Sequence, residues 1–357
     1  MRPVPMEPLA IPPGSHIAMR RAVRHPRELV SLVVAIVTSL ALLIWAVGEV
    51  LQAGQDQRDP NIYAVVVIAA PLLVWFARGQ LWAQERLRGI RLAPGQFPEA
   101  HAMLVDAAAR CGLSYVPDAY VVLGNGVINA AASGHGFRRF VLVHSDLLEV
   151  GGRAREPEAL RFVIAHEVGH IAAGHVSYWR ILATMASQWI PFIGSTLSRA
   201  QEYTADNYGF AIVPDGARPA MATLAGGKYL GRSVDVDTMA DRAVTEPGFF
   251  VWLVNGIASH PALLWRMHAL RDRRSPGRLL WRPRKPSPWP RQVDPSAYRL
   301  PELVGFVPTP HVEPSAPTPT AADLRAVEGV PAGSALASGT PTLSEAVTGQ
   351  RAPGSQR

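Results

Sequence analysis

Two long apolar stretches dominate the first eighty residues of the chain. The first runs from Leu29 to Gly48 without a charged side chain, and the second runs from Ile62 to Ala77. About 20 apolar residues are enough for a helix to cross a bilayer core, and a proline such as Pro71 is tolerated in a membrane helix. A signal peptide is the alternative, but its apolar region is shorter and is followed by a small-residue cleavage site. The pattern therefore predicts two transmembrane helices within residues 29–78.

The charges that flank these stretches predict an orientation. Arginines are concentrated in the basic N-terminal segment, residues 1–28, and again directly after the second stretch, whereas the short connecting loop is slightly acidic. Positive charge is retained on the cytoplasmic side of a membrane. We therefore expect a multi-pass protein of the cell membrane, held in lipid by a helical hairpin, with the following domain facing the cytoplasm.

Residues 79–274 have the mixed pattern of one compact domain. Helical periodicity predicts helices over 96–113, 157–175, 196–213, 218–230 and 260–273, and β-rich runs at 119–123 and 140–144 predict two paired or nearly paired strands. The aromatic residues Phe249, Phe250, Trp252 and Trp265 are expected in core packing, with the lining of a pocket as the alternative. From residue 275 onwards Pro, Ser, Thr, Ala and Gly dominate, which predicts a disordered tail over 275–357. The expected fold class is α+β, mainly helical, with a small sheet.

Composition narrows the functional classes. The chain has 357 residues, of which 48% are hydrophobic and only 18% charged, and a formal net charge of +7. The excess of arginine lies mainly beside the apolar stretches and in the last third, with no basic stripe interleaved with aromatic residues, so we expect no nucleic-acid partner. Cys111 is the single cysteine, which excludes an intrachain disulfide. Nothing in the pattern indicates an oligomeric state.

The strongest chemical signal is the motif HEVGH at 166–170, within an apolar helical segment. Residues four apart share one face of a helix, so the imidazoles of His166 and His170 can reach one metal ion. Glu167 can reach a water on that ion and act as a base. The motif predicts one zinc ion per chain. The alternative is a buried helix with two hydrogen-bonded histidines.

A catalytic zinc needs a third protein ligand. The metzincin pattern would require Gly and His where the chain has Ala173 and Val176, and His175 is predicted to point away, because five residues correspond to about 140° around a helix. A glutamate from a second helix is the remaining solution. The segment SRAQEYTADNYG offers Glu202, with Asp206 one turn later to orient a ligand histidine. A solvated helix face is the alternative for both carboxylates.

The segment 176–197 lies between these candidate ligands. Two membrane crossings need about 40 residues, and only 31 residues separate His170 from Glu202. We therefore expect a loop or a helical pair within the domain, with either core packing or contact with the bilayer.

In its order of motifs, the chain resembles the M48 zinc metallopeptidases, a gluzincin family that includes HtpX and the CAAX-prenyl proteases. The motifs are the N-terminal hairpin, NAAASG at 129–134, HEVGH, SRAQEYTAD and SHPALLWR. The resemblance implies a zincin-like domain in which His166, His170 and Glu202 bind zinc. It also implies that Glu167 is the base and that Asp206 holds a ligand in orientation.

The same resemblance assigns roles outside the two ligand helices. It implies that His260 stabilises an oxyanion or approaches the metal as a switch, and that Arg266 supports the site. Asn129 and Ala130 match an element beside the edge strand that pairs with the substrate backbone. The chain departs from these relatives in two ways: it is too short for membrane helices between the motif and Glu202, and its tail has no counterpart.

These observations predict a membrane-anchored zinc metalloendopeptidase that acts on proteins or peptides, with a hypothetical role in membrane-protein quality control. A substrate strand is expected to pair along residues 140–144. The main alternative is a catalytically silent zinc-fold scaffold that binds clients. A structural membrane protein with a coincidental HExxH motif is the third possibility.

Overall fold

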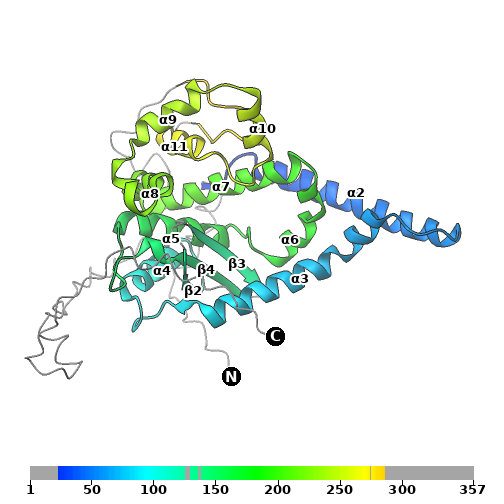
Figure 1. Cartoon of the computed structure of the whole chain (residues 1–357), viewed down its shortest axis with the longest axis horizontal. Coiled ribbons are helices and arrows are strands. Elements are labelled where there is room, and N and C mark those ends of the chain that lie inside the picture. The colour runs from blue at the N-terminus through cyan, green and yellow to red at the C-terminus, as the bar shows by residue number, and fades with distance from the viewer. Residues whose placement is uncertain (1–22, 125–128, 136–137, 274, 286–357) are drawn as a thin grey trace, which may run out of the picture. The chain divides into compact units, whose positions relative to one another are not determined.

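A computed structural model describes residues 23–124, 129–135, 138–273 and 275–285 (Figure 1). Most of the predicted N-terminal segment and of the predicted tail lies outside the described residues. The described helices are α2 (Glu28–Gln55), α3 (Ile62–Arg88), α4 (Pro98–Arg110), α5 (Pro157–Ala172), α6 (Tyr178–Thr184), α7 (Ile193–Ile212), α8 (Ala217–Leu230), α9 (Val236–Thr245), α10 (Phe249–Ile257) and α11 (Leu263–Arg271). The strands are β1 (Ile90–Arg91), β2 (Asp118–Val122), β3 (Ala130–His135) and β4 (Arg138–His144). The structure confirms a mainly helical fold with a small sheet.

The two apolar stretches form α2 and α3, both of which are long and apolar enough to cross a membrane. Each helix is longer than its apolar stretch and continues into polar residues. The side chain of Asn61 accepts a hydrogen bond from the Tyr63 amide and thereby caps the start of α3. The two helices contact each other through Ala46, Ala64 and Val67.

The sheet has the order β1-β2-β4-β3. β2 and β4 pair in parallel, as the sequence predicted for paired strands, whereas β1 and β3 run antiparallel to their neighbours. β3 was not predicted as a strand. Because β4 is paired on both sides, the expectation that a substrate strand pairs along residues 140–144 is wrong. β3, which pairs with β4, is the edge strand on that side of the sheet.

Helix α5 lies at the centre of the main core and is buried on almost every side. It packs against α4, α7, α8 and the sheet (Figure 1). Two glycines allow the contact between α5 and α7. A Cβ on Gly169 would lie 2.6 Å from Tyr208, and one on Gly209 would lie 3.0 Å from Phe162. Any larger residue would push apart the two helices that carry the predicted ligands.

The segment 176–197 forms α6, a 3₁₀ turn at Ala186–Trp189 and the start of α7. Of the two predicted forms, a loop or a helical pair within the domain, the structure shows the helical one. The segment packs against the base of α2, where the Ser187 amide donates to the Ser39 hydroxyl.

Residues 275–285 lie against α7, where Leu279 contacts Tyr203. The expectation that Phe249 and Phe250 are core residues is wrong, since they are 65% and 75% exposed.

Candidate metal centre

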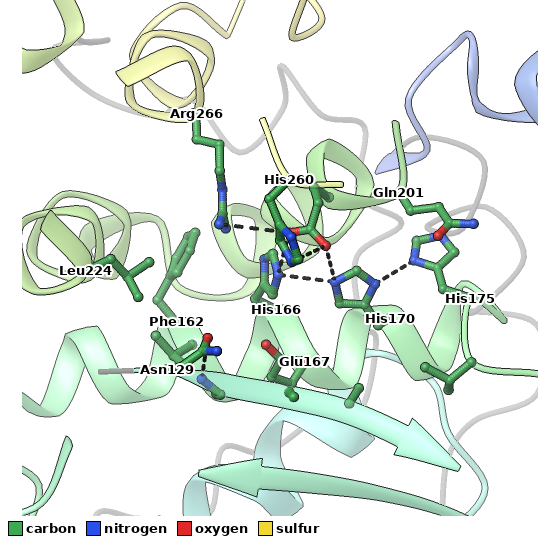
Figure 2. A pocket seen from close by; sticks show the side chains of 16 residues that line it. Asn129, Phe162, His166, Glu167, His170, His175, Gln201, Leu224, His260 and Arg266 are labelled. Atoms are coloured by element: carbon green, nitrogen blue, oxygen red, sulfur yellow. Dashed lines mark hydrogen bonds and ion pairs between the residues drawn. The ribbon is translucent and has the colours of Figure 1, made fainter. Parts of the chain in front are cut away.

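Helices α5 and α7 bring three candidate ligands together (Figure 2). The Nε2 atoms of His166 and His170 are 3.2 Å apart. The carboxylate of Glu202 lies 3.6 Å from Nε2 of His166 and 3.4 Å from Nε2 of His170. His166 and Glu202 are each only 6% exposed. The arrangement therefore places three donor atoms around one buried point.

The spacing of these donor atoms fits a zinc ion. With metal–ligand bonds of about 2.0–2.1 Å, two ligand atoms of a tetrahedral site lie about 3.3 Å apart. The separations are 3.2 Å between the two Nε2 atoms, 3.4 Å from His170 to Oε1 of Glu202 and 3.6 Å from His166 to Oε2 of Glu202, all close to that value. Two imidazoles and one carboxylate are also the donor set of a catalytic zinc site with a position left for water.

Asp206 and Arg266 support the first histidine. The Asp206 carboxylate lies 3.0 Å from Nδ1 of His166, and Arg266 donates two hydrogen bonds to the same carboxylate, at 2.9 and 2.6 Å. Burial alone would raise the pKa of Asp206, but the Arg266 charge and the hydrogen bonds lower it to about 2. The carboxylate is therefore ionised and holds the His166 ring with Nε2 towards the other ligands.

His175 contacts the second histidine, so the prediction that it points away is wrong. The Nδ1 atoms of His170 and His175 are 2.8 Å apart. The prediction assumed a continuous helix, but α5 ends at Ala172 and Gly174 adopts a left-handed conformation, with φ of 78°. The chain folds back, the His175 amide donates to the His170 carbonyl, and the imidazole returns to the site.

Glu167 and His260 lie in the same cavity as the candidate ligands (Figure 2). Glu167 follows His166 on α5 and is 6% exposed. His260 enters from the segment between α10 and α11, and its Nε2 lies 3.4 Å from a Glu202 oxygen. Ser259 contacts its Nδ1 at 2.9 Å. The imidazole is 66% exposed, so it borders the open side of the cavity.

The cavity has a volume of about 350 Å³ and reaches the edge strand β3. The Asn129 carbonyl accepts a hydrogen bond from His144 of β4, and pairing alternates along an antiparallel strand. The backbone groups of Ala130 and Ala132 therefore point away from β4. The carbonyl of Gly134, in the same phase, accepts a hydrogen bond from Arg78. Beside the candidate ligands, the outward edge of β3 therefore carries the Ala130 amide, which donates to the Asn129 side chain, and the backbone groups of Ala132.

Three contributors to the site were missed by the sequence reasoning. His175 and Glu28 form a polar connection to His170, and Arg199 holds the segment that carries His260. A glycine directly before His175 was the available signal for the first. For the other two, the partners are 56 to 147 positions away in sequence, so no local pattern reveals them.

A histidine pair on one core helix, a glutamate from a second helix and a small mixed sheet whose edge strand borders the same cavity define a zincin-type metallopeptidase. A model of Peptidase family M48 matches residues 94–193 and 180–274, which together span just over half of the chain. The chain belongs to peptidase family M48 and is a metallopeptidase. No curated protein and no solved structure matches it at a significant level.

Proposed function

We propose that this protein is a membrane-anchored zinc metalloendopeptidase whose zinc is held by His166, His170 and Glu202. The observation that carries the proposal is that the two imidazoles and the Glu202 carboxylate approach one another at the spacing of zinc ligands, in a cavity that also contains Glu167 and the edge of β3. A scaffold that only binds clients has no use for the carboxylate of Glu167 at this position.

The reaction is hydrolysis of a peptide bond. Bound zinc supplies a Lewis acid that polarises the scissile carbonyl and lowers the pKa of a water molecule. Glu167 accepts the proton of the attacking water and passes it to the leaving amine. His260, at the open side of the cavity, donates a hydrogen bond to the carbonyl oxygen as negative charge develops on it. Asp206 and Arg266 keep His166 in orientation throughout.

The substrate backbone is held by β3. An extended peptide adds to this outward edge at the Ala130 carbonyl and at Ala132, and backbone hydrogen bonds provide affinity with little dependence on side chains. The Asn129 side chain accepts a hydrogen bond from the Ala130 amide and fixes the start of this edge. The scissile bond then lies between β3 and the candidate ligands on α5.

The anchor determines where this chemistry takes place. Helices α2 and α3 cross the membrane as a hairpin, and the arginines at both flanks hold the peptidase domain on the cytoplasmic side. A site at that surface acts on proteins in or beside the bilayer, which fits a role in membrane-protein quality control.

The test compares two matched substitutions on α5. Glu167→Gln removes the base, whereas Glu158→Gln alters an exposed residue of the same helix that pairs with Arg161. Casein and membrane-protein cleavage by the full chain in detergent, together with zinc content, are measured for both. We expect Glu167→Gln to retain zinc and to lose activity by roughly 10²–10⁴-fold, and Glu158→Gln to match the wild type. Unchanged cleavage by Glu167→Gln, or no zinc in the wild type, refutes the proposal.

A further inference from the structure

Glu28, the first residue of α2, is a fully buried carboxylate close to the candidate metal centre. Its oxygens accept hydrogen bonds from Arg180 at 2.7 Å and from Thr204 at 2.5 Å, and Arg24 pairs with it as well. Nε2 of His175 lies 3.2 Å from Oε1. Glu28 is 0% exposed, so all of these contacts are shielded from water.

The positions of the protons in this chain of contacts follow from chemistry. An ionised carboxylate only accepts hydrogen bonds, so Nε2 of His175 carries the proton that faces Glu28. A neutral His175 then has a lone pair on Nδ1, and the Nδ1 of His170, 2.8 Å away, is the donor. With its proton on Nδ1, a neutral His170 has its lone pair on Nε2, the atom that faces Glu202.

We propose that Glu28 and His175 are positioning residues that fix His170 in the tautomer able to bind the metal. This inference rests on the proposed zinc site. The two ligand histidines are then oriented by carboxylates in parallel ways, His166 directly by Asp206 and His170 through His175 by Glu28. Because Glu28 begins α2, the base of the membrane hairpin is part of the metal centre's support.

Two substitutions of His175 separate this role from packing. Asn places an oxygen near the position of Nδ1 and can still accept the hydrogen bond from His170, whereas Phe fills the space of the ring but accepts nothing. Zinc affinity of the full chain in detergent is measured by competition with a chromophoric chelator. Loss of such an outer partner commonly costs 10–100-fold in metal affinity. We expect a loss of that size for His175→Phe and a smaller loss for His175→Asn.

The control is His268→Phe, which makes the same change at another buried histidine, one that contacts the Lys285 carbonyl. It is expected to leave zinc affinity unchanged. A packing role would give the opposite order, with the Phe variant close to wild type and the Asn variant weaker, and this would overturn the inference. If the Phe variant does not fold, ¹⁵N spectra of the metal-free wild type decide, since a proton on Nε2 of His170 overturns the inference. Absence of zinc in the wild type would instead refute the proposed function.

A second, independent observation concerns α10. Its side chains Phe249, Phe250, Val254 and Ile257 are 65%, 75%, 63% and 54% exposed, and residues 247–259 contain no charged side chain. An exposed apolar helix face of this kind marks an interaction surface. We call these four side chains the α10 face.

The α10 face lies beside the part of the protein that packs on the first membrane helix. Trp252 stacks on Phe192 with ring centroids 5.3 Å apart, and Phe192 directly precedes α7. The first turns of α7 pack on α2 through Leu197 and Leu32. α10 therefore packs, through Phe192, on the end of α7 that lies against the beginning of α2.

The length of the apolar part of α2 indicates how far along this helix the bilayer core extends. Ser39 still contacts the Ser187 amide, so the part of α2 beyond it, Leu40 to Leu51, is about 18 Å long at 1.5 Å per residue. A bilayer core is about 30 Å thick. The apolar core must therefore extend back along Val30–Ser39, the part of α2 against which the 3₁₀ turn with the exposed Trp189 packs.

We infer that the α10 face is immersed in the interfacial region of the bilayer, as a second membrane contact beside the hairpin. A lipid surface fits it better than a second protein copy, because α10 packs on the beginning of α7, which itself lies against the apolar part of α2. Tryptophan is also enriched at membrane interfaces, and Trp189 is 57% exposed here. The inference rests on the proposed membrane anchoring.

The test uses a fluorescent probe on single cysteines in the full chain with Cys111→Ala, reconstituted in vesicles that contain brominated phospholipids. Phe250→Cys reports the α10 face, Val47→Cys reports the hairpin and Leu230→Cys is an exposed apolar control on α8. We expect strong quenching at Val47, quenching at Phe250 that is greater with shallow than with deep bromines, and none at Leu230. Interfacial helices lie about 5–10 Å into the headgroup and acyl boundary.

The outcomes distinguish a failure of the α10 inference from a failure of the proposed membrane anchoring. If Val47 is quenched and Phe250 behaves like Leu230, the inference is overturned. The α10 face is then exposed to water or contacts the C-terminal segment or another copy of the chain. If Val47 is not quenched, the membrane anchoring itself is refuted. Neither result depends on whether the protein cleaves a substrate.

Discussion

Arg199 offers a sharp test of how α7 holds the segment that carries His260. Its guanidinium is fully buried and donates hydrogen bonds to four backbone carbonyls. Three of them, at Asn255, Gly256 and Ala258, belong to the C-terminal end of α10 and lie at 2.8, 2.6 and 2.8 Å, and the fourth, at Leu279, lies at 2.8 Å. The last carbonyls of a helix have no partner within the helix, so Arg199 supplies one.

Substitution of Arg199→Lys keeps the charge but replaces a planar fork with a single ammonium group. A hydrogen bond from a charged donor contributes roughly 1.5–3 kcal/mol, and a buried carbonyl left without a partner costs about 1–3 kcal/mol. If the lysine retains half of the four contacts, the free energy of unfolding falls by about 3–4 kcal/mol. For a chain of this size the melting temperature should fall by on the order of 10 °C. Because His260 follows two residues after Ala258, kcat should fall more than KM rises.

The assay is thermal unfolding of the zinc-loaded protein in detergent, together with steady-state cleavage. Arg232→Lys is the matched control, since Arg232 is 84% exposed and pairs with Glu156 at the surface. A surface pair contributes at most about 1 kcal/mol. If Arg199→Lys melts within 2 °C of this control and keeps its kcat, the buried guanidinium does not hold the His260 segment and the reasoning is wrong.

Two further predictions follow from the edge strand and from the support of His166. Ala132→Pro should raise KM by at least tenfold with little change in melting temperature, because the Ala132 amide points away from β4. Ala131→Pro removes a hydrogen bond to β4 and should instead lower the melting temperature. Equal effects of the two substitutions would contradict the assignment of which amides face β4. Asp206→Asn leaves the buried Arg266 without its carboxylate and His166 without its orienting partner. Zinc affinity, measured by chelator competition, should therefore fall by about 10–100-fold. An unchanged affinity would show that His166 needs no such support.

The central part of the site was predictable from local pattern. Two histidines four residues apart on an apolar helix share a face whatever the rest of the fold does, and the motif places Glu167 beside them. Glu202 followed from the need for a third ligand and from the exclusion of the metzincin pattern. The structure brings Glu202 to the two histidines, so that one ligand atom of each residue lies within 4.8 Å of the others.

The parts that were missed depend on partners distant in sequence. β3 has the sequence AAASGH, and alanine and glycine have low strand propensity, so only pairing with β4 and packing on α5 make it a strand. His175 was placed wrongly because the helix was extended three residues beyond its end at Ala172. Helix ends are the least certain part of any periodicity argument.

The short connection between α5 and α7 links α2 to the candidate metal centre. With only 31 residues between His170 and Glu202, the chain cannot leave for the membrane and return, so the segment folds as α6 and a 3₁₀ turn against α2. Arg180 of α6 then reaches Glu28 at 2.7 Å, and Glu28 reaches His175. Deletion of the hairpin to obtain a soluble domain would remove this carboxylate and leave Arg180 buried without a partner. A truncated domain starting after α2 should therefore bind zinc more weakly than the full chain, even though every proposed ligand is present in it.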